Sequence, residues 1–134
     1  MTAFIDTNVL IYAQQNGTKA DRARALLARG GKLSVQVLNE FAAVSRRKLG
    51  KDWREIAGAL DDALVLLGPP LALTLDLHVA ARKLAETYRL SVYAALIVAA
   101  AIEAGCDTLY SEDMQHGQVL GSLRIQNPFI ESPP

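Results

Sequence analysis

The stretch AFIDTN, residues 3–8, decides the fold, because three apolar residues are followed at once by three residues that favour a turn or a helix cap. A short apolar run indicates a buried strand, and Asp, Thr and Asn are side chains that begin helices. We therefore expect a strand over 3–5, a turn at 6–8 and a helix over 9–15.

The same alternation continues along the chain. Further strands are predicted by the apolar runs over 33–35, 71–75, 108–110 and 123–126, with helical patterns over 18–29, 37–49, 53–67, 76–88 and 92–104. Helix-start signals agree: Asp52 and Glu55 fit a capping box, and Thr18 and Ser91 stand at cap positions. Strands separated by helices require crossovers, so the fold class is α/β, with a short central parallel sheet flanked by helices on both faces.

Length and composition indicate one globular domain over 1–134, with 131–134 as a tail. The chain has 134 residues, 51% of them hydrophobic and 21% charged, which excludes disordered and fibrous classes. The longest uncharged apolar stretch without a proline, 90–102, is shorter than the roughly 20 residues of a membrane span. No export signal opens the chain and Cys106 has no partner for a disulfide, so we expect a cytoplasmic protein that does not contact membranes.

The net charge of zero hides an uneven distribution. Residues 1–54 hold ten Lys and Arg against four Asp and Glu, and residues 55–134 hold four against ten. A basic half favours a polyanionic partner. The alternative is that two solvated helix faces differ in sign, and the sequence leaves both readings open.

Common catalytic motifs are absent, which leaves acidic side chains as candidates. There is no GxGxxG or GxxxxGK[ST] phosphate loop and no GxSxG elbow, and one Cys with two distant His cannot form a structural zinc site. Asp6, Glu40 and Asp113 each follow a predicted strand, so they should converge at the carboxyl edge of the sheet. Converging carboxylates repel unless a divalent cation lies between them, and oxygen ligands suit Mg²⁺ or Mn²⁺. Each acid alone could equally be a helix cap or a surface residue.

Four segments together resemble PIN-domain nucleases, especially VapC-type toxins of toxin–antitoxin pairs. They are FIDTNVLIY (4–12), VLNEF (37–41), LSVYAALIVA (90–99) and TLYSEDMQ (108–115), in the family's order. The resemblance implies a metal-dependent endoribonuclease in which Asp6, Glu40 and Asp113 bind Mg²⁺ or Mn²⁺, with Glu112 as a candidate further ligand. Supporting positions are Thr7, Asn8, Ser111 and His116.

The resemblance also implies partners. Transfer RNA is the expected substrate, with loops of ribosomal RNA as the alternative, and Arg46, Arg47, Lys48 and Lys51 are expected to steer the RNA in a salt-sensitive way. A homodimer and a small VapB-type antitoxin that inserts a peptide into the acidic site are expected, with DNA bound only through the antitoxin.

One position departs from the family pattern. Ala94 stands where the family has an aspartate directly after the aromatic residue. Alanine supplies no ligand, so we expect weak metal binding and an impaired or inactive chain, and we favour engineered inactivation over natural loss. The alternative function is a non-catalytic PIN-like module that binds RNA or protein. A phosphatase of the haloacid dehalogenase kind is disfavoured because Asn8 stands where its second aspartate belongs.

Overall fold

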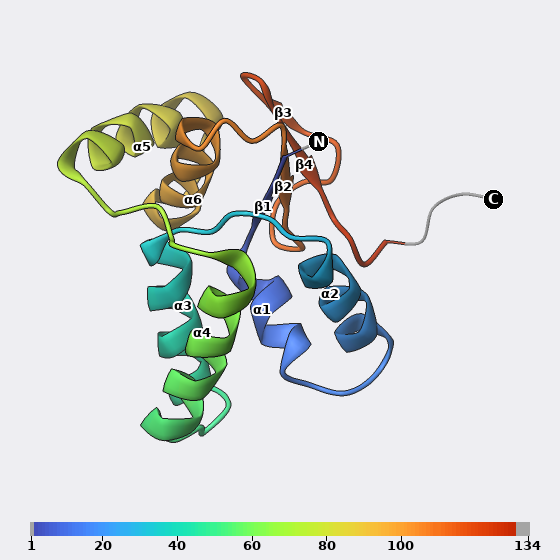
Figure 1. Cartoon of the computed structure of the whole chain (residues 1–134). Coiled ribbons are helices and arrows are strands. Elements are labelled where there is room, and N and C mark those ends of the chain that lie inside the picture. Colours follow the sequence, from blue (N-terminus) through green and yellow to red (C-terminus); the bar gives the residue numbers. More distant parts are fainter. Residues whose placement is uncertain (1, 131–134) are drawn as a thin grey trace.

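Strand β1 (Ala3–Ile5) leads directly into helix α1 (Thr7–Ala13) in the computed structural model, which describes residues 2–130 (Figure 1). Asp6 caps this helix: its carboxylate accepts the backbone N–H of Thr7 at 2.7 Å. Because the cap is Asp6 itself, the helix begins at residue 7 and not at the predicted residue 9. The predicted tail over 131–134 lies outside the described residues.

The remaining helices follow the predicted pattern within a few residues. They are α2 (Thr18–Ala28), α3 (Val35–Arg47), α4 (Trp53–Leu67), α5 (Leu75–Tyr88) and α6 (Val92–Glu103). The capping box of Asp52 and Glu55 and the Ser91 cap are confirmed. The prediction for Thr18 was wrong: Gly17 is the N-cap, without a side-chain hydrogen bond, and Thr18 is the first helical residue.

The sheet has the order β1-β2-β4-β3, with β2 (Thr108–Tyr110), β3 (Val119–Leu120) and β4 (Leu123–Gln126). The strands β1, β2 and β4 are parallel, as predicted. Strand β3 was not predicted, and it pairs antiparallel with β4, so the sheet is mixed. Two residues are too few to show an alternating pattern, and Gly121, with φ of 63°, makes the tight turn between β3 and β4.

The strands predicted over 33–35 and 71–75 are reduced to single bridges, Lys32 to Phe4 and Leu71 to Ser34. Ser34 and Thr74 cap α3 and α5 instead, accepting the N–H groups of Val37 and Leu77. Helices α3 and α5 therefore begin at Val35 and Leu75, the residues at which the two predicted strands were expected to end. The bridges are parallel to β1, so α3 still begins at the carboxyl edge of the sheet.

The core lies where the sheet meets its helices. Phe4, Leu109 and Ile125 are neighbours across the parallel strands and are fully buried. Helix α6 contacts β2 and β4 and buries residues 95–101 in succession, as its apolar sequence requires. Figure 1 shows α5 and α6 together on one side of the sheet, with α2 across from them.

Within residues 2–130, no helix taken singly has the length and apolar character to cross a membrane. Helices α5 and α6 meet that test only together, by length and composition, with a bend of 114° between them.

Candidate acidic site

The parallel pairing of β1 and β2 creates the site. Ile5 lies beside Tyr110, and the next backbone N–H, that of Asp6, donates to the Tyr110 carbonyl. The residues that follow the two strands, Asp6 and Ser111, are therefore adjacent although they are 105 positions apart.

The Ser111 hydroxyl serves two residues at once. The Asp113 N–H donates to Ser111 Oγ at 3.2 Å, which leaves the hydroxyl proton free to donate to Asp6 Oδ2 at 2.6 Å. Ser111 and Asp6 are 0% and 4% exposed, so both groups are held away from water. Ser111 thus fixes the Asp6 carboxylate and the turn that carries Asp113.

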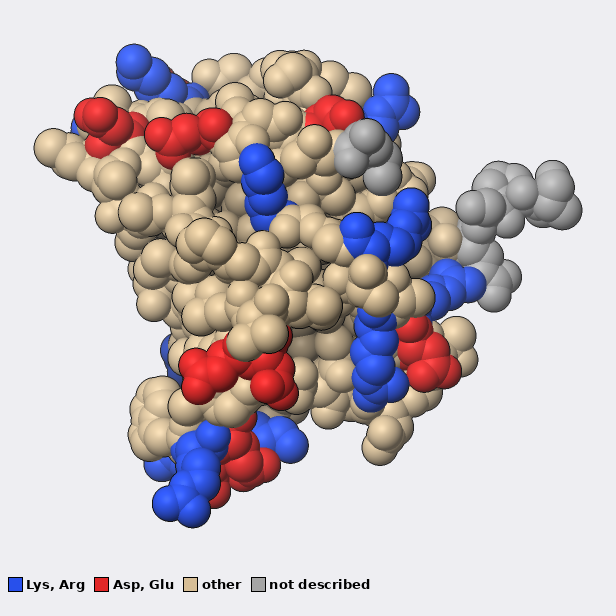
Figure 2. All heavy atoms as spheres, in the orientation of Figure 1, with Lys and Arg blue, Asp and Glu red and all other residues tan. Residues whose placement is uncertain are grey.

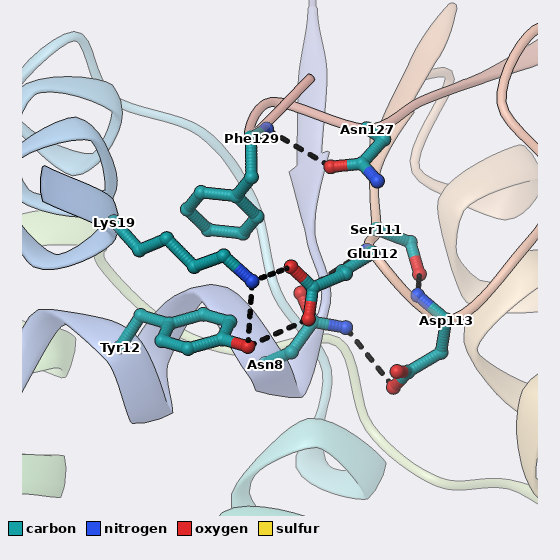
Figure 3. Close-up of polar contacts among 8 residues, drawn as sticks. All are labelled: Asn8, Tyr12, Lys19, Ser111, Glu112, Asp113, Asn127 and Phe129. Carbon is teal, nitrogen blue, oxygen red and sulfur yellow. Dashed lines mark hydrogen bonds and ion pairs between the residues drawn. The ribbon is translucent and has the colours of Figure 1, made fainter.

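Asn8 links the carboxylates of Asp6 and Asp113. Its side-chain NH₂ donates to Asp113 Oδ2 at 3.1 Å (Figure 3) and to Asp6 Oδ2 at 3.4 Å. Its Oδ1 accepts the backbone N–H of Glu112 at 3.3 Å. Because a backbone N–H can only donate, this contact orients the amide with its NH₂ toward both carboxylates.

Glu40 completes the predicted set of acids from α3. Burial raises the pKa of Asp6, against the hydrogen bonds from Ser111 and Thr7, and the charge of Asp113 raises it further. Burial also raises the pKa of Glu40, which Gln36 opposes by donating to its Oε2 at 3.0 Å, and the charges of Asp6 and Asp113 add to the rise. The charges of Asp6 and Asp113 therefore act on Glu40, and that of Asp113 acts on Asp6. Gln36 was missed, although its spacing of four residues from Glu40 on a helix could have revealed it.

The donor set fits a hard divalent cation in its chemistry. It consists of oxygen atoms, and the ion pairs within 4 Å among residues 2–130 involve other acids. The set is incomplete in its geometry, because no group of three His, Cys, Asp or Glu side chains in that range is placed to hold a metal ion. Beside Asp6, the buried Thr7 Oγ1 has no hydrogen-bond partner.

Ala94 stands at the position where the family resemblance expects a further carboxylate. It lies in the first turn of α6, where its N–H donates to Ser91 Oγ at 3.1 Å. This is the helical turn expected from the sequence, and its methyl group offers no oxygen.

Glu112 is turned away from the acids. Tyr12 Oη donates to its Oε1 at 2.6 Å, and Lys19 Nζ donates to its Oε2 at 2.7 Å (Figure 3). Partial burial acts to raise the pKa of Glu112, but the contacts with Lys19 and Tyr12 outweigh it and the pKa is lowered. The candidate further ligand is therefore not brought to Asp6 and Asp113. Tyr12 and Lys19 were missed because they lie 100 and 93 positions from Glu112.

His116 accepts its hydrogen bond from a residue outside the acidic set. Its Nδ1 accepts the backbone N–H of Asn127 at 3.0 Å, and its side chain is exposed. In this arrangement His116 fastens the segment that follows β4.

The predicted RNA-steering residues Arg46, Arg47, Lys48 and Lys51 lie at the end of α3 and in the loop before α4. Arg46 donates to the Lys51 carbonyl at 3.1 Å and lies over the Trp53 ring, and Lys51 pairs with Glu55 at 3.8 Å. Figure 2 shows basic and acidic atoms side by side at the free end of α3 and α4. This end is mixed in charge, and the RNA-steering role stays a prediction.

Comparisons with known proteins agree with this architecture. The family model of the PIN domain matches residues 3–119. VapBC2 from Rickettsia felis, solved bound to a DNA fragment from its promoter, has a TM-score of 0.68 and 21% identity, over 95% of this chain and 98% of that chain. VapC20 from Mycobacterium tuberculosis, a toxin that cleaves the sarcin-ricin loop, has a TM-score of 0.66 and 20% identity, over 84% and 90%. At these identities the two structures establish a shared fold. No curated protein sequence matches the chain.

Proposed function

Because the chain belongs to the PIN domain family, we propose that it is a metal-dependent endoribonuclease toxin of the VapC type whose acidic site lacks one carboxylate. The observation that carries the proposal is that Asp6 and Asp113 share one amide donor, Asn8, and that neither has a basic partner within residues 2–130. Held carboxylates that repel one another are costly in a purely structural role and useful in a site that takes a cation.

Asp6, Glu40 and Asp113 would hold Mg²⁺, with Mn²⁺ as the alternative. The bound cation would supply an activated water and stabilise the leaving oxygen of an RNA phosphodiester. Ser111 and Asn8 hold two of the carboxylates in place beforehand, which reduces the reorganisation needed on binding. Gln36 does the same for Glu40.

The expected partners are an RNA substrate, transfer RNA in the first instance, a VapB-type antitoxin and a second copy of the chain. A groove of about 240 Å³ between α1, α2 and α4 is lined mainly by apolar residues such as Leu10, Leu27 and Leu60, with Arg24 and Asp62 among its polar residues, which supports docking of an amphipathic antitoxin segment. Val65 and Leu75, 88% and 76% exposed, support a further interface. The promoter-bound VapBC2 structure motivates the expectation that DNA is bound through the antitoxin.

The second candidate is a non-catalytic PIN-like module that binds RNA or protein. Ala94 favours it, as does the lack, within residues 2–130, of three side chains placed to hold a metal. The retained bonding of Asp6, Asn8, Ser111 and Asp113 opposes it, because a site without a ligand has no need of them.

The test compares the chain with its Ala94→Asp variant on total cellular RNA, with Mg²⁺, Mn²⁺ or EDTA. We expect the variant to cut RNA about 100-fold faster or more, to stop in EDTA, and to gain a larger rise in Tm with Mn²⁺. Ala57→Asp, which adds the same charge at an exposed position of α4, is the matched control and should stay like the parent. If neither chain cuts RNA or is stabilised by metal, the binding module is the better account.

A further inference from the structure

Three side chains from separate elements form a closed cluster beside the acidic site (Figure 3). Tyr12 on α1 and Lys19 on α2 each contact one carboxylate oxygen of Glu112, at 2.6 and 2.7 Å. Lys19 Nζ also donates to Tyr12 Oη at 3.3 Å. Lys19 can only donate, so the tyrosine proton is directed to Glu112 and every contact in the triangle has a defined direction.

Aromatic rings and the segment after β4 support this cluster. The Tyr12 and Phe129 rings meet edge to face with centroids 4.8 Å apart, and Lys19 Nζ lies 4.8 Å from the Tyr12 ring centre. The Phe129 N–H donates to Asn127 Oδ1 at 2.9 Å. The Glu112 side chain is only 25% exposed, so its ion pair is less screened by water than a pair on the open surface.

The backbone N–H of Glu112, unlike its carboxylate, contacts a residue of the acidic site. Its N–H donates to Asn8 Oδ1, the contact that turns the Asn8 NH₂ toward Asp6 and Asp113. Glu112 also stands between Ser111 and Asp113, the two residues that the site uses from this turn. Whatever fixes the Glu112 side chain therefore fixes the orientation of the Asn8 amide.

We propose that Tyr12 and Lys19 are positioning residues of the acidic site, which grip Glu112 and thereby set the Asn8 amide and the spacing of Asp6 and Asp113. The inference rests on the proposed function for its catalytic readout and deepens it. In this proposal the Glu112 carboxylate is paired with Lys19 and Tyr12 and holds its turn in place, and it is not a metal ligand. The side-chain hydrogen bonds of Tyr12 and Lys19 go to Glu112 and to each other.

The kinetic test uses the Ala94→Asp chain as background. Tyr12→Phe keeps the ring contact with Phe129 and removes only the hydroxyl, and Lys19→Met removes the charge at a side chain that is 51% exposed, so the fold is retained. Each should lower kcat about 10-fold with KM within about twofold, and the double variant should be no worse than the single ones, because both act through Glu112.

Lys19→Arg should restore activity. Tyr88→Phe and Arg22→Met are the matched controls and should leave kcat unchanged.

A second readout needs no activity and uses the chain with Ala94. In ¹⁵N-labelled protein, Tyr12→Phe and Lys19→Met should shift the Asn8 side-chain amide signals and speed hydrogen exchange at the Glu112 N–H, whereas Tyr88→Phe should do neither. If Ala94→Asp never cuts RNA while the Asn8 signals respond, the proposed function fails and the positioning role stands.

Three outcomes overturn the proposal. One is an unchanged kcat together with unchanged Asn8 signals in both variants. Another is a rise in KM with additive effects in the double variant, which would mean that Lys19 contacts RNA directly. The third is loss of the Mn²⁺-induced rise in Tm in Glu112→Gln but not in Tyr12→Phe or Lys19→Met, which would make Glu112 a ligand.

Discussion

The acidic site has two sides that are built differently. On the β1–β2 side, Asp6 accepts hydrogen bonds from Thr7, Ser111 and Asn8. On the α3 side, Glu40 accepts one from Gln36. The Asp6 carboxylate is therefore held by three donors and the Glu40 carboxylate by one, and neither takes part in an ion pair among residues 2–130.

The largest effect should come from breaking the β1–β2 side with Ser111→Ala. The change removes the Ser111 donor from the buried Asp6 Oδ2, which keeps only the 3.4 Å contact from Asn8, and takes the Oγ acceptor from the Asp113 N–H, so the free energy of unfolding at pH 7 should fall by about 2 kcal/mol. Urea denaturation measures it. Ser45→Ala, at a buried serine of α3, is the control and should cost less. Equal losses would mean that the hydroxyl bonds of Ser111 carry no special weight.

A smaller effect should follow from Asn8→Asp, which replaces the amide donor between Asp6 and Asp113 with a third carboxylate. The new carboxylate can still accept the Glu112 N–H, but it faces Asp6 and Asp113 with repulsion where an NH₂ donated. Stability at pH 7 should fall by about 1 kcal/mol, and Mn²⁺ should raise Tm more than in the parent. Asn16→Asp, in an exposed turn, is the comparison in thermal denaturation. A Mn²⁺ response no larger than that of Asn16→Asp would contradict this account.

The smallest effect should come from removing the carboxylate charge on α3 with Glu40→Gln. The pKa of Glu40 is raised by folding, so its ionisation is penalised in the folded state, and stability from this group is present at acid pH and lost as pH rises through the folded pKa. Glu40→Gln should therefore stabilise the chain at pH 7 by about 0.5 kcal/mol. At about pH 3, below the ordinary value of 4.5, the gain should vanish because Glu40 is then neutral in both states. A gain that is the same at both pH values would refute the electrostatic cause.

Local signals explain what the sequence could predict of the fold. The capping box at Asp52 and the cap at Ser91 act within one helical turn, so they were found correctly. The segments 33–35 and 71–75 carry strand-like residues, but Ser34 and Thr74 begin helices there, and capping outweighed strand propensity. Strand β3 is defined by its pairing with β4 and not by its own two residues.

The candidate site divides in the same way. Asp6 and Asp113 follow parallel strands, so their meeting could be inferred from strand order. The direction of the Glu112 side chain could not, because its partners Tyr12 and Lys19 come from distant parts of the chain and leave no local pattern. Neighbouring residues in one motif, Glu112 and Asp113, face different environments.

The pairing of β1 with β2 also has a consequence in time. Ala3 pairs with Thr108, so β1 cannot pair with β2 until the ribosome has added the 105 residues that separate the two positions. At about 5–20 residues per second, that delay is on the order of 5–20 seconds. Until then Asp6 has no Ser111 and Asn8 has no Asp113, so a growing chain carries no assembled acidic site. The acidic site can therefore assemble only after the chain has been synthesised through Asp113.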